Sequence, residues 1–261
     1  MHKALWVSKT GLQAQDKQLA TISNNLANVS TTGFKKDRAV FQDLIYQIQR
    51  QPGAQSTQDS QLPSGLQLGS GTRVVGTQKQ FTQGDLEITE QTLDLAINGR
   101  GFFQIQMPDG TVSYTRDGTF HLSADGEIVN ANGFLLGDGI IVPEQTKTLT
   151  ISRDGIVQAF LNNDPEPIEI GNIEIVDFVN PAGLEAIGNN LFLETPASGG
   201  AEIGIPSLDG FGSVVQGALE KSNVAIVEEM VDMIATQRAY EMNSKVVSTA
   251  DSMLGFITQT L

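Results

Sequence analysis

A seven-residue spacing of apolar side chains at both ends of the chain is the feature that most restricts its fold. Leucines recur at every seventh position in residues 5–29, and the same spacing returns in residues 224–261. This spacing predicts two helices, each carrying a coiled-coil seam that needs a partner. The predicted seam residues are Leu5, Leu12, Leu19, Ile22, Leu26 and Val29 in the first helix and Ile226, Met230, Met233, Tyr240, Val247, Leu254 and Ile257 in the second.

The usual interpretation of a single helix with this spacing is that it packs on an ordinary globular core. The faces between the apolar positions favour contact with other protein surfaces, because they are rich in Ser, Thr, Asn and Gln rather than in charged residues. The charges point the same way: residues 1–45 carry six basic and three acidic residues, and residues 219–261 carry six acidic and three basic ones. Opposite net charge favours pairing and fixes the register of the partners.

Composition excludes several classes of protein. The net charge is −14 over 261 residues, and the acidic excess lies in the segment between the helices. The chain therefore lacks the clustered Lys/Arg surface that nucleic-acid binding requires. It has no cysteine for a disulfide or a zinc–thiolate site. No apolar run approaches the roughly 18 residues of a membrane span, and the N-terminus lacks the continuous apolar run of a cleaved signal peptide.

The first helix is predicted over residues 3–29, with a stop at residues 30–33, where Gly33 can take the left-handed conformation that closes a helix. Residues 34–48 fit a short helix only loosely, so this segment stays ambiguous. Residues 1–46 are assigned to the N-terminal helical segment of a core domain. Residues 219–261 are assigned to the C-terminal helix that completes this domain.

Residues 47–72 form a polar stretch rich in Gln, Pro and Gly, with only Arg50 and Asp59 charged. Such a segment cannot build a core by itself. It is either a disordered linker or an extension that becomes ordered on contact with another surface.

Residues 73–218 alternate between apolar and polar side chains and are divided by repeated turn dipeptides. These dipeptides are Asn98–Gly99, Asp109–Gly110, Asp117–Gly118, Asp125–Gly126, Asn132–Gly133, Asp138–Gly139 and Asp154–Gly155. Each supplies the positive φ that tight hairpin turns require, which predicts successive antiparallel strands. The expected fold is α+β and mainly β: N- and C-terminal helices in a coiled-coil-like core domain, a long extended stretch and a central antiparallel β domain.

Candidate catalytic residues are few. The histidines are His2 and His121, and His121 alternates with apolar neighbours as a surface strand residue does. Three Asp–Gly pairs at eight-residue intervals resemble a calcium repeat, but oxygen ligands are too sparse within each turn. Residues 99–101 lack the third glycine of a phosphate-binding loop. Carboxylates are abundant, yet no pair is singled out for glycoside cleavage. We therefore expect no enzyme, no cofactor and no metal site.

Several motifs resemble those of one family. SNNLANVSTTGFK at residues 23–35 closely resembles the N-terminal signature of bacterial flagellar rod and hook proteins. SNV at 222–224, EEMV at 228–231 and TQRAYE at 236–241 resemble their C-terminal signature, and NGRGFF at 98–103 and YTRDG at 114–118 are similar to their β-domain motifs. The signature residues are Asn24, Asn25, Leu26, Asn28, Gly33, Phe34, Gln237, Arg238, Ala239 and Tyr240.

Within that family, the polar stretch is similar to the insertion typical of distal-rod members. The resemblance implies an extended element that lies on neighbouring subunits and stiffens a straight rod, carried by Gln51, Pro52, Gly53, Leu62, Pro63 and Gly65. A proximal-rod or hook paralogue is the alternative within the family and should lack the insertion. A periplasmic carbohydrate-binding or hydrolysing protein is the alternative outside it, but the single tryptophan, Trp6, lies on the first helix and not in a sugar-stacking cluster.

The resemblance implies a structural subunit of the distal rod that self-assembles, as a homo-oligomeric helical polymer, into a tubular drive shaft carrying torque from motor to hook. The implied partners are other flagellar rod proteins, the hook protein, the P- and L-ring proteins and the flagellar type III export apparatus. The implied location is the basal body in the periplasm, reached without a cleaved signal peptide.

Overall fold

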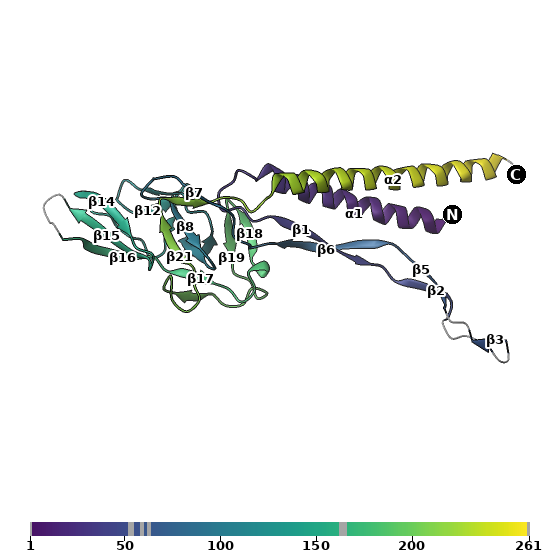
Figure 1. Cartoon of the computed structure of the whole chain (residues 1–261), viewed down its shortest axis with the longest axis horizontal. Helices are drawn as coiled ribbons and strands as arrows, with labels where there is room; N and C mark the ends of the chain where they lie inside the picture. Colours follow the sequence, from purple (N-terminus) through teal and green to yellow (C-terminus); the bar gives the residue numbers. More distant parts are fainter. Residues whose placement is uncertain (1, 52–54, 58–59, 62–63, 162–165, 260–261) are drawn as a thin grey trace. The chain divides into compact units, whose positions relative to one another are not determined.

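The computed structural model describes residues 2–51, 55–57, 60–61, 64–161 and 166–259 (Figure 1). The chain divides into two compact units, which are described separately. Unit 1 comprises Met1–Ala27, Asp37–Gln78 and Ala225–Leu261, and unit 2 comprises Asn28–Lys36 and Lys79–Val224. Each unit is therefore assembled from segments that lie far apart in the sequence.

Unit 1 contains the two long helices. Helix α1 (His2–Ala27) and helix α2 (Ile226–Gln259) lie side by side and run antiparallel (Figure 1). The predicted first helix is confirmed, although it ends two residues earlier than expected. The residues that follow form turns, and Gly33 has the predicted positive φ, at +68°. No helix within the described ranges is both long enough and apolar enough to cross a membrane.

The rest of unit 1 is a β ribbon. Its strands are β1 (Asp37–Asp43), β2 (Tyr46–Arg50), β3 (Gln55–Thr57), β4 (Ser60–Gln61), β5 (Leu66–Gly69) and β6 (Thr72–Lys79). Strand β1 pairs with β6, β2 pairs antiparallel with β5, and β3 pairs antiparallel with β4. The loose helical fit of residues 34–48 was thus misleading, because ladder bonds to strands later in the chain decide this segment and local periodicity does not report them.

Unit 2 is built from antiparallel strands. These are β7 (Leu86–Ile88), β8 (Leu95–Asn98), β9 (Phe102–Gln106), β10 (Val112–Thr115), β11 (Phe120–Leu122), β12 (Ile128–Asn130), β13 (Leu135–Leu136), β14 (Thr146–Ile151), β15 (Ile156–Leu161), β16 (Ile168–Asn172), β17 (Ile175–Asp177), β18 (Glu185–Gly188), β19 (Leu191–Leu193), β20 (Glu202–Gly204), β21 (Ser213–Gln216) and β22 (Ala218–Glu220), with a 3₁₀ turn at Pro181–Gly183.

The largest sheet of unit 2 has the order β11-β12-β13-β9-β10-β19-β18, and β17 joins it beside β9 and pairs with β20. Strands β14, β15 and β16 form a separate sheet, while β21 pairs with β8 and β22 with β7. All of these pairings are antiparallel, as predicted.

Most of the predicted turn dipeptides behave as expected, with a positive φ at the glycine. Gly118 is the exception, since it is absent from the residues with positive φ. A Cβ atom at Gly118 would lie only 1.5 Å from the carbonyl oxygen of Leu95. This glycine is therefore required for close backbone approach between two segments and not for a hairpin turn.

Strand β9 divides the apolar core of unit 2. Successive side chains of a strand point to opposite faces, and here Phe103 joins one cluster with Ile105 and Phe120, while Phe102 joins another with Phe178 and Phe192. In the second cluster the aromatic rings meet edge to face, with centroids 5.9 Å apart for Phe102 and Phe178. Phe102 and Phe103 are thus buried on opposite faces of β9.

Candidate functional site

The predicted seam of α1 faces α2 only in part. Ile22 is buried, and Leu5, Leu12, Leu19 and Leu26 are half-buried. Val29, also half-buried, lies beyond the end of α1 and belongs to unit 2. Three positions that the prediction did not include are buried on α1: Ser8, Ala14 and Asn25.

The predicted seam of α2 divides into covered and exposed positions. Met233, Val247 and Leu254 are half-buried, whereas Ile226, Met230 and Tyr240 are exposed. The side chain of Ile257 lies outside the described part of the chain. The buried positions of α2 are Glu229, Thr236 and Ala250, which follow the same seven-residue spacing with smaller or polar residues. A search for apolar side chains alone misses Glu229 and Thr236.

The side of α2 that faces away from its buried positions is also apolar. Val227, Val231 and Ile234 lie on this side in the first turns. Met242, Val246 and Met253 are exposed further along the helix, on its flank, since Val246 and Met253 are four and three residues from the buried Ala250. All are exposed, with 75% of Val227 accessible to solvent. A helix that is apolar on opposite sides requires burial against more than one partner.

The β ribbon of unit 1 also exposes apolar side chains. Ile45 is 82% exposed, and Ile48, Leu66, Leu68 and Val75 are exposed as well. An isolated two-stranded ribbon is at best marginally stable in water, so a ribbon with this many exposed apolar side chains gains stability from contact with another surface. Of the residues predicted to stiffen the rod, Gln51 is exposed and Gly65 half-buried. Pro52, Gly53, Leu62 and Pro63 lie outside the described residues.

Asn25, from the N-terminal signature, makes a set of hydrogen bonds within unit 1. Its Oδ1 accepts from the Asp37 N–H at 2.9 Å, and its Nδ2 donates to the Asp37 carbonyl at 2.9 Å and to Glu229 Oε2 at 3.2 Å. These bonds join the end of α1, the start of β1 and the first turn of α2. Asn25 thereby links both terminal segments of the chain.

The other signature residues have varied surroundings. Asn28 Oδ1 accepts from the Thr31 hydroxyl at 3.2 Å, and the ammonium of Lys79 lies 5.4 Å from the ring centroid of Phe34. Leu26 and Ala239 are half-buried. Asn24, Gln237, Arg238 and Tyr240 are exposed.

Gly33 packs against the YTRDG segment inside unit 2. Its N–H donates to the carbonyl of Glu220 at 2.8 Å. A Cβ atom at Gly33 would lie 2.6 Å from the Asp117 nitrogen, and the φ of +68° already disfavours other residues. Both close packing and backbone conformation therefore require glycine here.

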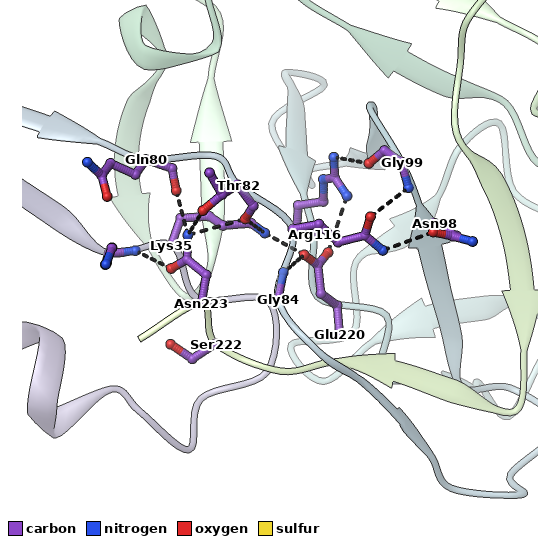
Figure 2. A network of polar contacts seen from close by, with 12 residues as sticks. Lys35, Gln80, Thr82, Gly84, Asn98, Gly99, Arg116, Glu220, Ser222 and Asn223 are labelled. Atoms are coloured by element: carbon purple, nitrogen blue, oxygen red, sulfur yellow. Dashed lines mark hydrogen bonds and ion pairs between the residues drawn. The ribbon is translucent and has the colours of Figure 1, made fainter. Parts of the chain in front are cut away.

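A buried ion network in unit 2 joins three of the signature segments (Figure 2). The ammonium of Lys35 donates to Glu220 Oε1, and Arg116 Nη1 donates to Glu220 Oε2 at 3.2 Å. The Gly84 N–H also donates to Glu220 Oε1, at 2.9 Å. Lys35 further donates to the Thr82 carbonyl at 2.9 Å, and Arg116 Nη2 to the Gly99 carbonyl at 2.8 Å. The side chains of Lys35 and Glu220 are fully buried.

The network pairs two buried cations with one buried carboxylate. Burial lowers the pKa of Lys35, against the opposing effect of the Glu220 carboxylate, and burial likewise lowers the pKa of Arg116. Arg116 also lies 5.3 Å from the ring centroid of Phe102, and its Nε is a buried donor without a hydrogen-bond partner among the described atoms. Two cations share one carboxylate, so Glu220 is the member whose loss would leave the most charge unpaired.

Asn223, from the C-terminal signature, organises the neighbouring backbone of unit 2. Its Oδ1 accepts from the Lys36 N–H at 2.8 Å. Its Nδ2 donates to the Gln80 carbonyl at 2.8 Å and to the Thr82 hydroxyl at 2.9 Å (Figure 2). Together with the ion network, these bonds hold the N-terminal, C-terminal and β-domain motifs in one place.

The sequence did not predict that Lys35, Arg116 and Glu220 form a buried network. Lys35, Arg116 and Glu220 each lie within or beside a recognised motif, but nothing in a single sequence shows that they meet. The one indication in the sequence of a buried charge is a charged residue that directly follows apolar strand residues, as Glu220 follows Ala218 and Leu219. Within the described ranges, no three His, Cys, Asp or Glu side chains are grouped so that they could hold a metal ion.

Three family models match the chain. Residues 5–35 match a model described as flagella basal body rod protein. Residues 96–159 match the flagellar hook protein FlgE/F/G D1 domain, and residues 215–260 match the flagellar basal body rod FlgEFG protein C-terminal region. The ion network and the Asn25 and Asn223 hydrogen bonds include residues that lie within or next to these three matched segments.

Full-length relatives give the same result. The chain is 51% identical over 259 residues to the flagellar basal-body rod protein FlgG of Buchnera aphidicola subsp. Schizaphis graminum, covering 99% of this chain and 100% of the relative. It is 49% identical over 257 residues to FlgG of Borreliella burgdorferi, covering 98% and 97% of the two chains. For FlgG of Caulobacter vibrioides the identity is 45% over 258 residues, covering 98% of each.

Proposed function

Because the chain belongs to the family of flagellar basal-body rod proteins FlgG, it is a structural subunit of the rod and not an enzyme, and we propose that it polymerises with copies of itself into the distal rod. The proposed product is a helical, tubular drive shaft that carries torque from the motor to the hook. Such an assembly is open, since one surface of each subunit meets a different surface of the next.

The observation that carries this proposal is the apolar surface of unit 1. Helix α1 covers one side of α2, and we infer that neighbouring subunits cover the opposite side, at Val227, Val231 and Ile234. The exposed seam residues Ile226, Met230 and Tyr240 would become buried in the same step. Burial of apolar area is the main favourable contribution to such an association.

We further propose that α1 and α2 form a coiled-coil-like core domain. Small residues support this packing, because Gly11 lies against Asn243, and Ala14 and Ala250 are buried. In this proposal residues 1–46 and 219–261 make the core domain, residues 47–72 extend from it, and residues 73–218 form the central β domain.

The β2–β5 ribbon is proposed to lie on neighbouring subunits and to stiffen the rod. Exposed Ile48 and Leu66 in these strands, with Ile45 just before β2, support a role in contact rather than as a passive linker. Deleting residues 46–69 joins Ile45 to Ser70. The Leu44 N–H, which donates to the Gly71 carbonyl, then lies at the base of a two-residue hairpin loop. We expect rods from this deletion to be bent or more flexible in electron micrographs, with the urea unfolding midpoint of unit 2 unchanged. Straight rods of unchanged stiffness would contradict the stiffening role.

The family places the chain in the flagellar basal body. The proposed partners there are other flagellar rod proteins, the hook protein, the P- and L-ring proteins and the flagellar type III export apparatus. The proposed compartment is the periplasm, reached without a cleaved signal peptide.

Immunogold labelling of isolated basal bodies tests the proposed position. An antibody raised against unit 2 should label the part of the rod nearest the hook. Label confined to the end of the rod nearest the inner membrane would show a proximal-rod subunit instead, and label along the hook would show a hook paralogue.

A further inference from the structure

The chain passes between the two units at four places, after residues 27, 36, 78 and 224. Two asparagine side chains bind the segments that make these crossings, one within each unit. Asn25 does so in unit 1 and Asn223 in unit 2. Every hydrogen bond involved lies inside a single unit.

Asn25 is 2% exposed. Within unit 1 it contacts the segments next to three of the four crossings. It lies two residues before the first crossing, and its amide bonds both backbone groups of Asp37, the first residue after the second crossing, at 2.9 Å each. Its second amide proton reaches Glu229 Oε2 at 3.2 Å, in the first turn of α2 soon after the last crossing. One side chain thus connects the first, second and last crossings.

Asn223 has the corresponding position in unit 2. It lies just before the last crossing and accepts from the N–H of Lys36, the final residue before the second crossing, at 2.8 Å. It donates to Gln80, two residues after the third crossing, at 2.8 Å. The Gln80 N–H closes the set by donating to the Lys36 carbonyl at 2.9 Å. Figure 2 shows the amide of Asn223 between Gln80 and Thr82.

We propose that Asn25 and Asn223 are positioning residues that hold the crossing segments together as bundles, one within each unit. Twist would then pass between the units through hydrogen-bonded bundles and not through four independent linkers. Asparagine suits this role because its amide offers an acceptor and two donors in one short side chain. Aspartate keeps the acceptors and loses the donors, while alanine loses both. The use of the bundles in carrying torque rests on the proposed function, but the bundles themselves exist within one chain.

The test is a spin-label distance measurement on full-length monomer by double electron–electron resonance. The chain has no cysteine, so labels attach only at introduced positions. Ala20→Cys on α1 and Ala131→Cys between β12 and β13 are both exposed sites, one in each unit. The matched control is Asn180→Ala, which removes an asparagine bond to the Ala197 carbonyl within unit 2, away from the crossings.

Asn25→Ala and Asn223→Ala should each broaden the distance distribution, while Asn180→Ala should not. Asn223→Asp keeps the acceptor for the Lys36 N–H but sets a carboxylate oxygen against the Gln80 and Thr82 carbonyls, so it should also broaden the distribution and is a second test beside the alanine variant. Unchanged widths in folded Asn25→Ala and in a folded Asn223 variant would overturn the proposal. Because the measurement uses monomer, a failure of rod assembly would contradict the proposed function and leave this result unaffected.

Discussion

Unit 1 and unit 2 differ most in how completely they bury their apolar side chains. The buried apolar residues of unit 1, among those the structure describes, are Ala14, Ile22, Ala39 and Ala250. Unit 2 buries two clusters that include Phe102, Phe103, Phe120 and Phe178, and most of the exposed large apolar residues of the chain belong to unit 1. Unit 2 therefore has its own apolar core, although residues such as Ile88 and Val179 remain exposed, whereas the helices of unit 1 bury few apolar side chains within one chain.

The buried polar groups follow the same division. In unit 2, Glu220 accepts from two buried cations and a backbone N–H within a single closed network. In unit 1, Asn25 and Glu229 form a smaller pairing between the two helices. Buried ion pairs contribute less to stability than their charges suggest, but removing one member is costly. The network therefore fixes which segments of unit 2 meet.

The largest expected effect is from Glu220→Ala, which leaves Lys35 and Arg116 buried without their shared carboxylate. We expect a loss of about 3–5 kcal/mol in the free energy of unfolding of unit 2, measured by urea denaturation with near-UV circular dichroism. The matched control is Lys221→Ala, which breaks the exposed pair of Lys221 with Glu87 and should cost at most about 1 kcal/mol. Equal losses in the two variants would show that the network does not specify unit 2.

A smaller effect is expected from pH. Burial lowers the pKa of Lys35 below its ordinary value of 10.5. Between the lowered pKa and 10.5 the unfolded chain binds the proton that the folded chain has released, so the contribution of Lys35 makes unfolding free energy rise with pH. Lys35→Met should lose this contribution in urea titrations at a series of pH values. Tyr114, whose pKa is raised by burial, is present in both the parent and Lys35→Met and so contributes equally to the two. If the unfolding free energy changes with pH by the same slope in the two proteins, the assignment to Lys35 is wrong.

The smallest effect on the monomer is expected from Val231→Ser, on the exposed side of α2. Because Val231 is exposed, the unfolding free energy of the monomer should change by no more than about 0.5 kcal/mol. Polymerisation, followed by light scattering, should nevertheless weaken if a neighbour covers this side. Thr249→Ser, at another exposed position of α2, is the control and should assemble like the parent. Unchanged assembly of Val231→Ser would remove this side of α2 from the proposed interface.

The sequence was sufficient to predict the features that depend on local patterns. The heptad spacing predicted both helices, and the repeated Asp–Gly and Asn–Gly dipeptides predicted the antiparallel strands of unit 2 and the positive φ of most turn glycines. The family resemblance, carried by short motifs, was confirmed by the full-length relatives. Local spacing is informative here because it reports the type of each element, but it gave the buried face of α2 only in part, since Ile226, Met230 and Tyr240 are exposed.

The features that depend on distant segments were not predictable in this way. Residues 34–48 form strands because β1 and β2 pair with β6 and β5, across the polar stretch. The approach of Lys35, Arg116 and Glu220 depends on the whole of unit 2 being folded. Gly118 looked like a turn residue, and only the nearby Leu95 carbonyl explains it. In each case the deciding contact is absent from the local sequence.

Hydrogen–deuterium exchange in monomer and in assembled rods tests the central contrast most directly. Amides of β9 and β10 in unit 2 should be strongly protected in both states, because their core is complete in one chain. Amides of α1 and α2 should exchange much faster in the monomer and become protected on assembly, when neighbours cover the exposed apolar side of α2. Helices that are as protected in the monomer as β9, with no gain in the rod, would contradict the account.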